Sequence, residues 1–261
     1  MRRLLAIFVV IGILAPLVPL VLWSGAQTWA YPDLLPTDGT TRGLSLVVSS
    51  ESWRALATST VVATAVAVLS CAIGLPAGRV VGVHRFRGRR LVQFMLLAPV
   101  IVPGLAVILG LQVFFIRWGL SETIVGVVLV QLVLTVPYAA TVLGGAFEAF
   151  DVDLERQARV LGAGPIRTTA LITIPALGPA LAASMLLTFL ISWSEYILTL
   201  LIGGGQVQTL PLLLFATIGS ADTTAAAALG LLIVIPPVLL VLAASRLLRS
   251  RGGMLTGMAR S

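Results

Sequence analysis

The chain has 261 residues, of which 58% are hydrophobic and 10% are charged, and its formal net charge is +7. Soluble globular domains are about half apolar and about a quarter charged, so this composition excludes a water-exposed protein and predicts a membrane protein. Every basic residue is an arginine, and a chain without lysine cannot form an ATP-binding P-loop, in which a lysine reaches the phosphates.

Single cysteine and histidine residues exclude several kinds of site. Cys71 is the only cysteine and His84 is the only histidine, which excludes an internal disulfide, a multi-histidine metal site and the HExxH motif. We therefore expect no metal site and no cofactor in this chain. The arginines lie beside apolar stretches, which is typical of orientation in a membrane and argues against nucleic-acid binding.

Six stretches are long and apolar enough to cross the hydrocarbon core, which takes about 20 residues. They are predicted to be helices, because lipid offers no partner for unpaired backbone groups and the alternation of a β-barrel is absent. The fold class is therefore all-α, with residues 1–261 forming one transmembrane domain. The predicted spans are 4–23, 55–78, 91–116, 123–147, 177–202 and 223–245.

The arginines also predict the orientation. With the N-terminus inside, fourteen arginines fall on the cytoplasmic side and three fall outside, so both termini are predicted to be cytoplasmic. The first span resembles a signal peptide, with Arg2 and Arg3 before it and small residues at 24–26 after it. Its apolar run is longer than the usual ~7–15 residues, so we expect it to be retained. No fold is predicted for the outer segment 24–51.

The connection between the fourth and fifth spans, residues 148–176, differs from the others and is called the 148–176 loop below. Asp151 or Asp153 is suited to cap a short helix. Gly162–Gly164 is expected to end that helix, and Pro165 suits the first turn of a second one. Apolar residues recur at helical spacing in both helices, at Leu154, Ala158 and Leu161 and at Ile166, Ala170 and Ile174. Local chemistry leaves two interpretations open, a docking surface or a hairpin folded against its own bundle.

From Glu155 to Pro175 the loop resembles the EAA motif of type I ABC importer permeases, which has Glu-Ala-Ala, then Gly after three residues, then Ile-x-Leu-Pro after nine more. Aligned on Gly162, the second alanine of the motif falls on Ala158, and the motif ends at 172–175 with Ile174 in place of leucine. The chain departs from the motif at its start, where Arg156 stands at the Glu position, with Glu155 one place earlier, and Gln157 stands at the first Ala position.

The resemblance implies a permease subunit of the bacterial inner (cytoplasmic) membrane that is not itself an enzyme. In that family the loop forms a coupling helix that seats in a groove of an ATPase subunit. Carried over, Gly162 permits the turn. The small apolar contacts would be Ala158, Leu161 and Ala163, and the polar contacts at the rim would be Glu155, Arg156 and Arg159. The implied partners are two ATPase subunits carrying ATP and Mg, a second permease (a paralogue or another copy), and an extracellular binding protein.

Glu195 is the only acidic residue inside a predicted span, where a charged residue costs roughly 2.5–3.5 kcal/mol on insertion scales. With Ser192, Trp193 and Tyr196 it forms the most polar patch of any span and a candidate translocation path. The alternative is structural, with Glu195 bonding freed backbone groups or bracing a neighbouring helix.

Two features bear on the solute. Sugar-type permeases often read Asp-Gly-Ala where this chain has Leu161-Gly-Ala163, and the segment from Glu195 through Pro211 is similar to the polyamine, thiamine and ferric-iron permease group. The resemblance favours that group, with a sugar-type importer as the alternative. A secondary transporter would more typically show inverted halves and a broken helix at mid-membrane, and a non-transporting accessory subunit that keeps the docking loop stays open.

Overall fold

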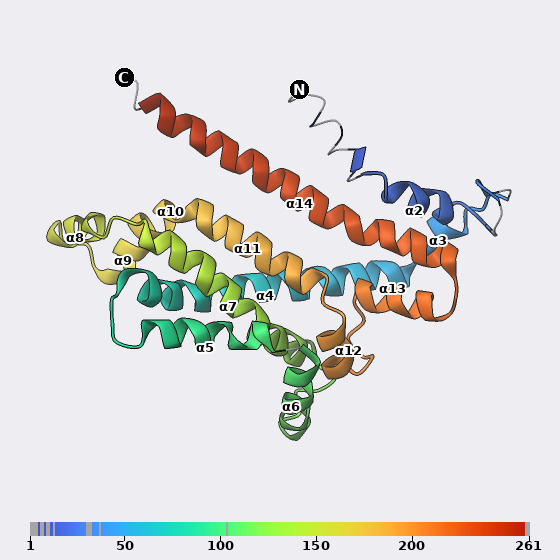
Figure 1. The fold of residues 1–261 in the computed structure, drawn as a ribbon, viewed down its shortest axis with the longest axis horizontal. Coiled ribbons are helices and arrows are strands. Elements are labelled where there is room, and N and C mark those ends of the chain that lie inside the picture. The colour runs from blue at the N-terminus through green and yellow to red at the C-terminus, as the bar shows by residue number, and fades with distance from the viewer. Residues whose placement is uncertain are drawn as a thin grey trace. The chain divides into compact units, whose positions relative to one another are not determined.

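Every named element of the computed structural model is helical, within the residues that it describes: 5, 8, 11, 12, 14–29, 33–36, 38–102 and 104–258, with side chains except those of 104 and 247–258. The predicted all-α class is confirmed (Figure 1). The helices are α2 (Leu17–Ser24), α3 (Arg42–Val47), α4 (Ser50–Val83), α5 (Arg89–Ile101), α6 (Gly104–Arg117), α7 (Ile124–Glu148), α8 (Asp153–Val160), α9 (Pro165–Thr168), the π-helical turn η1 (Thr169–Thr173), α10 (Ile174–Ala176), α11 (Gly178–Trp193), α12 (Ile197–Gly203), α13 (Leu210–Gly219) and α14 (Thr223–Met258).

Three helices are each long and apolar enough to cross a membrane, namely α4, α7 and the Thr223–Arg246 part of α14. The second and sixth predicted spans lie within α4 and α14, and the fourth lies within α7 apart from its first residue, Thr123, which is the N-cap. Two pairs of helices joined at a bend count as two further spans if each pair crosses the membrane as one unit. Helix α5 joins Leu105–Arg117 of α6 at a 90° bend, and Pro165–Ala176 joins α11 at a 77° bend. The described residues therefore hold three to five candidate spans.

Two predicted spans are not single straight helices in the structure. The third is divided between α5 and α6, where Val102 has an extended backbone (φ −74°, ψ 133°), the conformation favoured before a proline. That proline, Pro103, itself lies outside the described residues. The fifth is divided between α11 and α12 at residues 194–196. The first predicted span lies partly outside the described residues, so six spans and cytoplasmic termini stay predictions.

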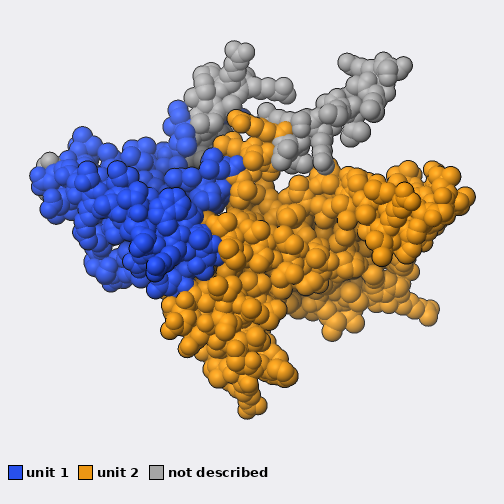
Figure 2. All heavy atoms as spheres, turned by 180° about the vertical axis from the view of Figure 1, so that it is seen from behind, with its two compact units in different colours: residues 1–59, 208–239 blue, residues 60–207, 240–261 orange. Residues whose placement is uncertain are grey.

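The chain divides into two compact units (Figure 2): residues 1–59 with 208–239, and residues 60–207 with 240–261. The first unit gives structure to the outer segment, for which the sequence predicted none. Ala26 and Gly39 form an isolated antiparallel bridge, and Thr224 Oγ1 donates a hydrogen bond of 2.6 Å to the Ala26 carbonyl. Arg42 forms an ion pair with Asp222.

The second unit is organised around close packing of α4 against α7. Gly74, Gly78 and Gly82 recur every four residues on α4 and face α7. A Cβ at these positions would lie 2.7 Å from the Ala139 side chain, 2.8 Å from the Gly144 nitrogen and 2.5 Å from the Gly144 oxygen, respectively. The two backbones therefore touch, as small residues permit between membrane helices, and we call this contact the glycine seam. Helix α11 packs on α7 as well (Figure 1).

Candidate functional site

The 148–176 loop leaves the end of α7 and folds as a hairpin of short helices (Figure 1). Its first helix, α8, starts with a local hydrogen bond in which the Asp153 backbone N–H donates to Asp151 Oδ1 at 2.9 Å. Acidic residues occupy the first turn, at Asp153 and Glu155, where they complement the positive end of the helix dipole. The residue at the N-cap is Val152, and it makes no side-chain capping bond, so the predicted capping of this helix by Asp151 or Asp153 is wrong; Asp151 lies one residue before the cap and accepts only the bond from Asp153.

Helix α8 ends at Val160 with Leu161 as its C-cap, and the predicted glycine turn follows at Gly162. Gly162 has φ +87°, a left-handed conformation that residues with a Cβ rarely adopt. The Ala163 N–H bonds to the Ala158 carbonyl and the Gly162 N–H to the Arg159 carbonyl, both at 3.0 Å. These two bonds are those of a Schellman motif, so the chain reverses at a turn that depends on glycine.

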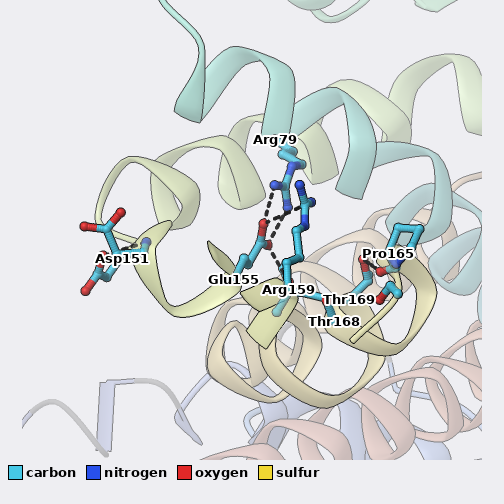
Figure 3. Close-up of polar contacts among 10 residues, drawn as sticks. Arg79, Asp151, Glu155, Arg159, Pro165, Thr168 and Thr169 are labelled. Atoms are coloured by element: carbon cyan, nitrogen blue, oxygen red, sulfur yellow. Dashed lines mark hydrogen bonds and ion pairs between the residues drawn. The ribbon is translucent and has the colours of Figure 1, made fainter. Parts of the chain in front are cut away.

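The second arm of the hairpin starts at Pro165, in the first turn of α9 as predicted. Thr168 and Thr169 donate hydrogen bonds to the carbonyls of Gly164 and Pro165, both at 3.0 Å (Figure 3). The arm continues through the π-helical turn into α10 and then bends by 77° into α11.

Glu155 points into the molecule rather than away from it. The residue is only 2% exposed, and Arg79 of α4 holds its carboxylate with two hydrogen bonds, Nη1 to Oε1 at 2.6 Å and Nη2 to Oε2 at 2.5 Å (Figure 3). Thr173 Oγ1 donates a third hydrogen bond to Oε1 at 2.5 Å, and Arg159 Nη2 lies 4.0 Å from Oε2. The carboxylate is therefore saturated by groups of its own chain.

These contacts keep Glu155 ionised. The pKa of Glu155 is lowered from 4.5 to about 2; the hydrogen bonds from Arg79 are the largest cause, burial opposes them, and the Thr173 hydrogen bond and the charges of Arg79 and Arg159 contribute the rest. A bidentate arginine–carboxylate pair fixes the relative orientation of the two side chains and also stabilises the charge of the carboxylate. The pair is thus a permanent and directional link between α4 and α8 at physiological pH.

The other predicted coupling residues lie on or near the outer side of the hairpin. Arg156 is exposed and pairs with Asp153 at 2.7 Å, Arg159 is also exposed, and Ala158 and Ala163 are half-buried. Leu161 is 88% exposed. Two neighbours are exposed as well, Val160 to 88% and Ile166 to 84%; Ile166 was predicted in the apolar stripe of the second helix but not as a coupling residue, and Val160 was missed. The three large residues Val160, Leu161 and Ile166 are called the apolar tip below.

The second candidate site lies at the break between α11 and α12. Ser192 and Trp193 are buried, and Glu195 and Tyr196 are half-buried. Glu195 Oε1 accepts a hydrogen bond of 2.9 Å from the backbone N–H of Leu198, in the first turn of α12. This bond favours the structural alternative, in which Glu195 satisfies backbone groups freed by the break, and the translocation path stays a prediction.

Gln131 on α7 is a functional candidate that sequence reasoning missed. Its side chain is buried, accepts a 2.5 Å hydrogen bond from Ser192 and donates one of 3.0 Å to Thr199. One amide therefore ties α7 to both α11 and α12, as polar side chains do between membrane helices. The signal in the sequence is an amide in the middle of an otherwise apolar span. Among the described residues, no group of three or more His, Cys, Asp or Glu is placed to hold a metal.

Comparison with known proteins decides the family. Residues 74–251 match the family of binding-protein-dependent transport system inner membrane components. The chain belongs to this family. It is therefore a multi-pass permease subunit of an ABC importer in the inner membrane, and ATP hydrolysis takes place on a partner subunit. Membership overturns the secondary-transporter alternative, even though α11 and α12 form a broken helix.

Individual relatives agree with this assignment. The chain is 28% identical to the putrescine transport system permease protein PotI of Escherichia coli over 204 residues, which cover 75% of this chain and 68% of PotI. It is 33% identical over 141 residues to the molybdate/tungstate transport system permease protein WtpB of Pyrococcus abyssi, covering 54% and 56% of the two chains. A bacterial ABC transporter that imports alginate has the same fold, with a TM-score of 0.71, 19% identity and 94% of each chain covered.

Proposed function

We propose that this permease moves a small solute inward by alternating access, driven by an ATPase subunit that docks on the 148–176 loop. The apolar tip carries this proposal. Its three large side chains are each more than four-fifths exposed and lie around one tight turn. Water disfavours such a cluster, and a cluster of this kind is typical of a protein interface.

The proposed docking surface of the loop has an apolar part, the apolar tip, and a charged part, formed by two arginines. The apolar tip provides side chains that lose contact with water when a groove encloses them. Arg156 and Arg159 lie beside it and are exposed, so they are suited to the rim of the interface. Glu155 is turned inward and does not belong to this surface. The docking surface is therefore Val160, Leu161 and Ile166, with Ala158, Gly162 and Ala163 as small neighbours and two arginines at the rim.

The assembly that this proposal requires has two ATPase subunits, a second permease and an extracellular binding protein. The solute is proposed to be of the polyamine type, which the similarity to PotI over three quarters of this chain supports. The similarity to WtpB favours a metal oxyanion as the second candidate. Sugar is a third, because the fold alone is shared with the alginate importer.

The docking surface is tested with the chain and its ATPase subunit co-expressed. Leu161→Asp is expected to weaken ATPase binding by about 30-fold or more, the effect of a central interface residue, and to stop uptake. Leu34→Asp is the matched control, because Leu34 is 91% exposed but lies outside the loop. Undiminished ATPase binding by the Leu161 variant would contradict the proposal.

The transport activity and the solute are tested in liposomes that contain the whole complex. Radiolabelled putrescine, molybdate and maltose are offered in turn, with and without ATP. ATP-dependent uptake of putrescine is expected. Uptake of molybdate or maltose instead would replace the polyamine proposal, and ATP-independent uptake by the permease alone would overturn the ATP-driven mechanism. A complex that binds ATPase but moves none of the three would favour an accessory subunit.

A further inference from the structure

We propose that the contact of Arg79 with Glu155 and Thr173 is a mechanical joint that carries movement of the 148–176 loop into α4 and α7. The proposal rests on the docking function of the loop proposed above. It assigns Arg79 and Glu155 as positioning residues, since neither faces the docking surface. We call this contact the Arg79–Glu155 joint.

The contact between Arg79 and Glu155 is directional. Arg79 and Glu155 are 76 positions apart in the chain, and two nearly parallel hydrogen bonds of 2.6 and 2.5 Å connect them. A bidentate pair resists rotation as well as separation. The Glu155 side chain is 3% exposed and that of Arg79 is 29% exposed, so water competes poorly for these bonds. A displacement of α8 is therefore transferred to the end of α4.

The Glu155 carboxylate also connects the two arms of the hairpin. Glu155 lies on α8, in the first arm, and Thr173 lies in the π-helical turn of the second arm. Their 2.5 Å hydrogen bond is buried. The turn at Gly162 joins the arms at the other end. The hairpin is thus closed at both ends and moves as one piece when its tip is pushed.

Arg79 also contacts α7. Its guanidinium carbon lies 5.7 Å from the centre of the Phe147 ring on α7, within the range of a cation–π contact. Arg79 also follows Gly78 and precedes Gly82, two members of the glycine seam. The joint therefore attaches the hairpin at a point where α4 and α7 already form one close-packed pair.

A purely static brace is the competing explanation, and the two differ in what they predict. A brace keeps the loop folded, so its loss lowers ATPase binding and uptake together. A joint transmits movement, so its loss leaves the ATPase bound and active while uptake falls. The ratio of solute imported to ATP hydrolysed therefore separates the two.

The experiment uses the complete complex in liposomes, with whichever of radiolabelled putrescine, molybdate or maltose the wild-type complex imports. The main variant is the double replacement Arg79→Met with Glu155→Leu. It leaves no unpaired buried charge, and apolar replacement of both partners of a buried pair is commonly tolerated. Glu155→Gln is the single variant that stays closest in shape. Arg42→Gln is the control, because it breaks another ion pair that lies outside the loop.

We expect both joint variants to retain the bound ATPase and its hydrolysis, and to import about tenfold less solute per ATP, a change in the range of ordinary allosteric coupling. Arg42→Gln is expected to match the wild type. Wild-type solute import per ATP in the double variant would overturn the joint, and so would equal losses of ATPase binding and uptake in both variants. A wild-type complex without ATP-driven uptake would instead contradict the function proposed above.

Discussion

The inner and outer faces of the 148–176 loop are built from opposite kinds of side chain. The inner face holds a buried carboxylate and two buried hydroxyls, those of Glu155, Thr168 and Thr173, whereas the outer face exposes the large apolar side chains of the apolar tip. A helical hairpin of a soluble protein has the reverse arrangement, with apolar residues inside. The side chains of each face therefore match what that face contacts: a charged arginine of the same chain on the inner face, and the proposed docking partner on the outer face.

The polar groups of the inner face fix the orientation of the loop, because hydrogen bonds are directional and apolar packing is not. Arg79, Thr173 and Arg159 surround the carboxylate of Glu155, so burial of its charge is compensated. The outer face is apolar, as expected of a surface that the proposed ATPase partner covers reversibly. The inner contact is thus expected to determine stability and coupling, and the outer contact is expected to determine binding. Four predictions test this division.

The largest expected effect is on the inner face. Arg79→Ala leaves the Glu155 charge buried without its main partner, which costs about 3–5 kcal/mol of unfolding free energy. Thermal unfolding of the detergent-solubilised chain measures the loss. Arg79→Ala combined with Glu155→Leu removes the orphaned charge and should recover most of it. A single variant as stable as the wild type would show that the pair contributes nothing to the fold.

Acid tests the same contact without mutation. The pKa of Glu155 is about 2 in the folded chain and 4.5 without its partners. A depressed carboxyl pKa stabilises the fold above pH ~4.5, and this stabilisation, about 3 kcal/mol for a shift of this size, is lost as the pH falls towards 2. Stability should therefore not change through this group between pH 6 and 8. In Glu155→Gln this acid-dependent part should disappear, and an unchanged acid profile in that variant would contradict the assignment.

The turn that joins the two arms of the hairpin should have a smaller effect. Gly162→Ala places a Cβ in a left-handed conformation at φ +87°, which costs about 1–2 kcal/mol, although no other atom lies within 4 Å of that position. Gly164→Ala is the matched control, because Gly164 has equally open surroundings but an ordinary φ of −68°. Equal stability of the two variants would show that the left-handed turn is not required.

Local chemistry was sufficient to predict the outline of the loop. Gly162 and Pro165 mark the turn and the second helix through backbone preferences that act within a few residues, so the sequence alone places them. The partner of Glu155 was not predictable in this way, because Arg79 lies 76 positions away and only the packing of α4 on α7 brings it near. Without that contact, Glu155 was grouped with Arg156 as a rim residue.

The role of Gln131 also depends on contacts between residues that are distant in the chain, and apolar content does not predict the bends in the helices. Apolar content located the long helices α4, α7 and α14, but a hydropathy pattern carries no information about bends. Pro103 favours a kink in the third predicted span, whereas no proline marks the division of the fifth at residues 194–196, which was missed. Gln131 was missed because a single amide in an apolar stretch becomes informative only when its partners Ser192 and Thr199 are known.

The smallest expected effect comes from the second ion pair of α8, between Arg156 and Asp153. Their side chains are 74% and 63% exposed, so water and salt screen the attraction, and Arg156→Gln should change the unfolding free energy by less than about 0.5 kcal/mol. Thermal unfolding of Arg156→Gln and of Arg79→Ala compares two arginine–carboxylate pairs. The carboxylates of both pairs, Asp153 and Glu155, lie on α8. A similar loss in both would mean that burial is not what distinguishes the inner face. A large difference would assign the stability of the loop to the Arg79–Glu155 joint, and would leave Arg156 free to act at the docking surface.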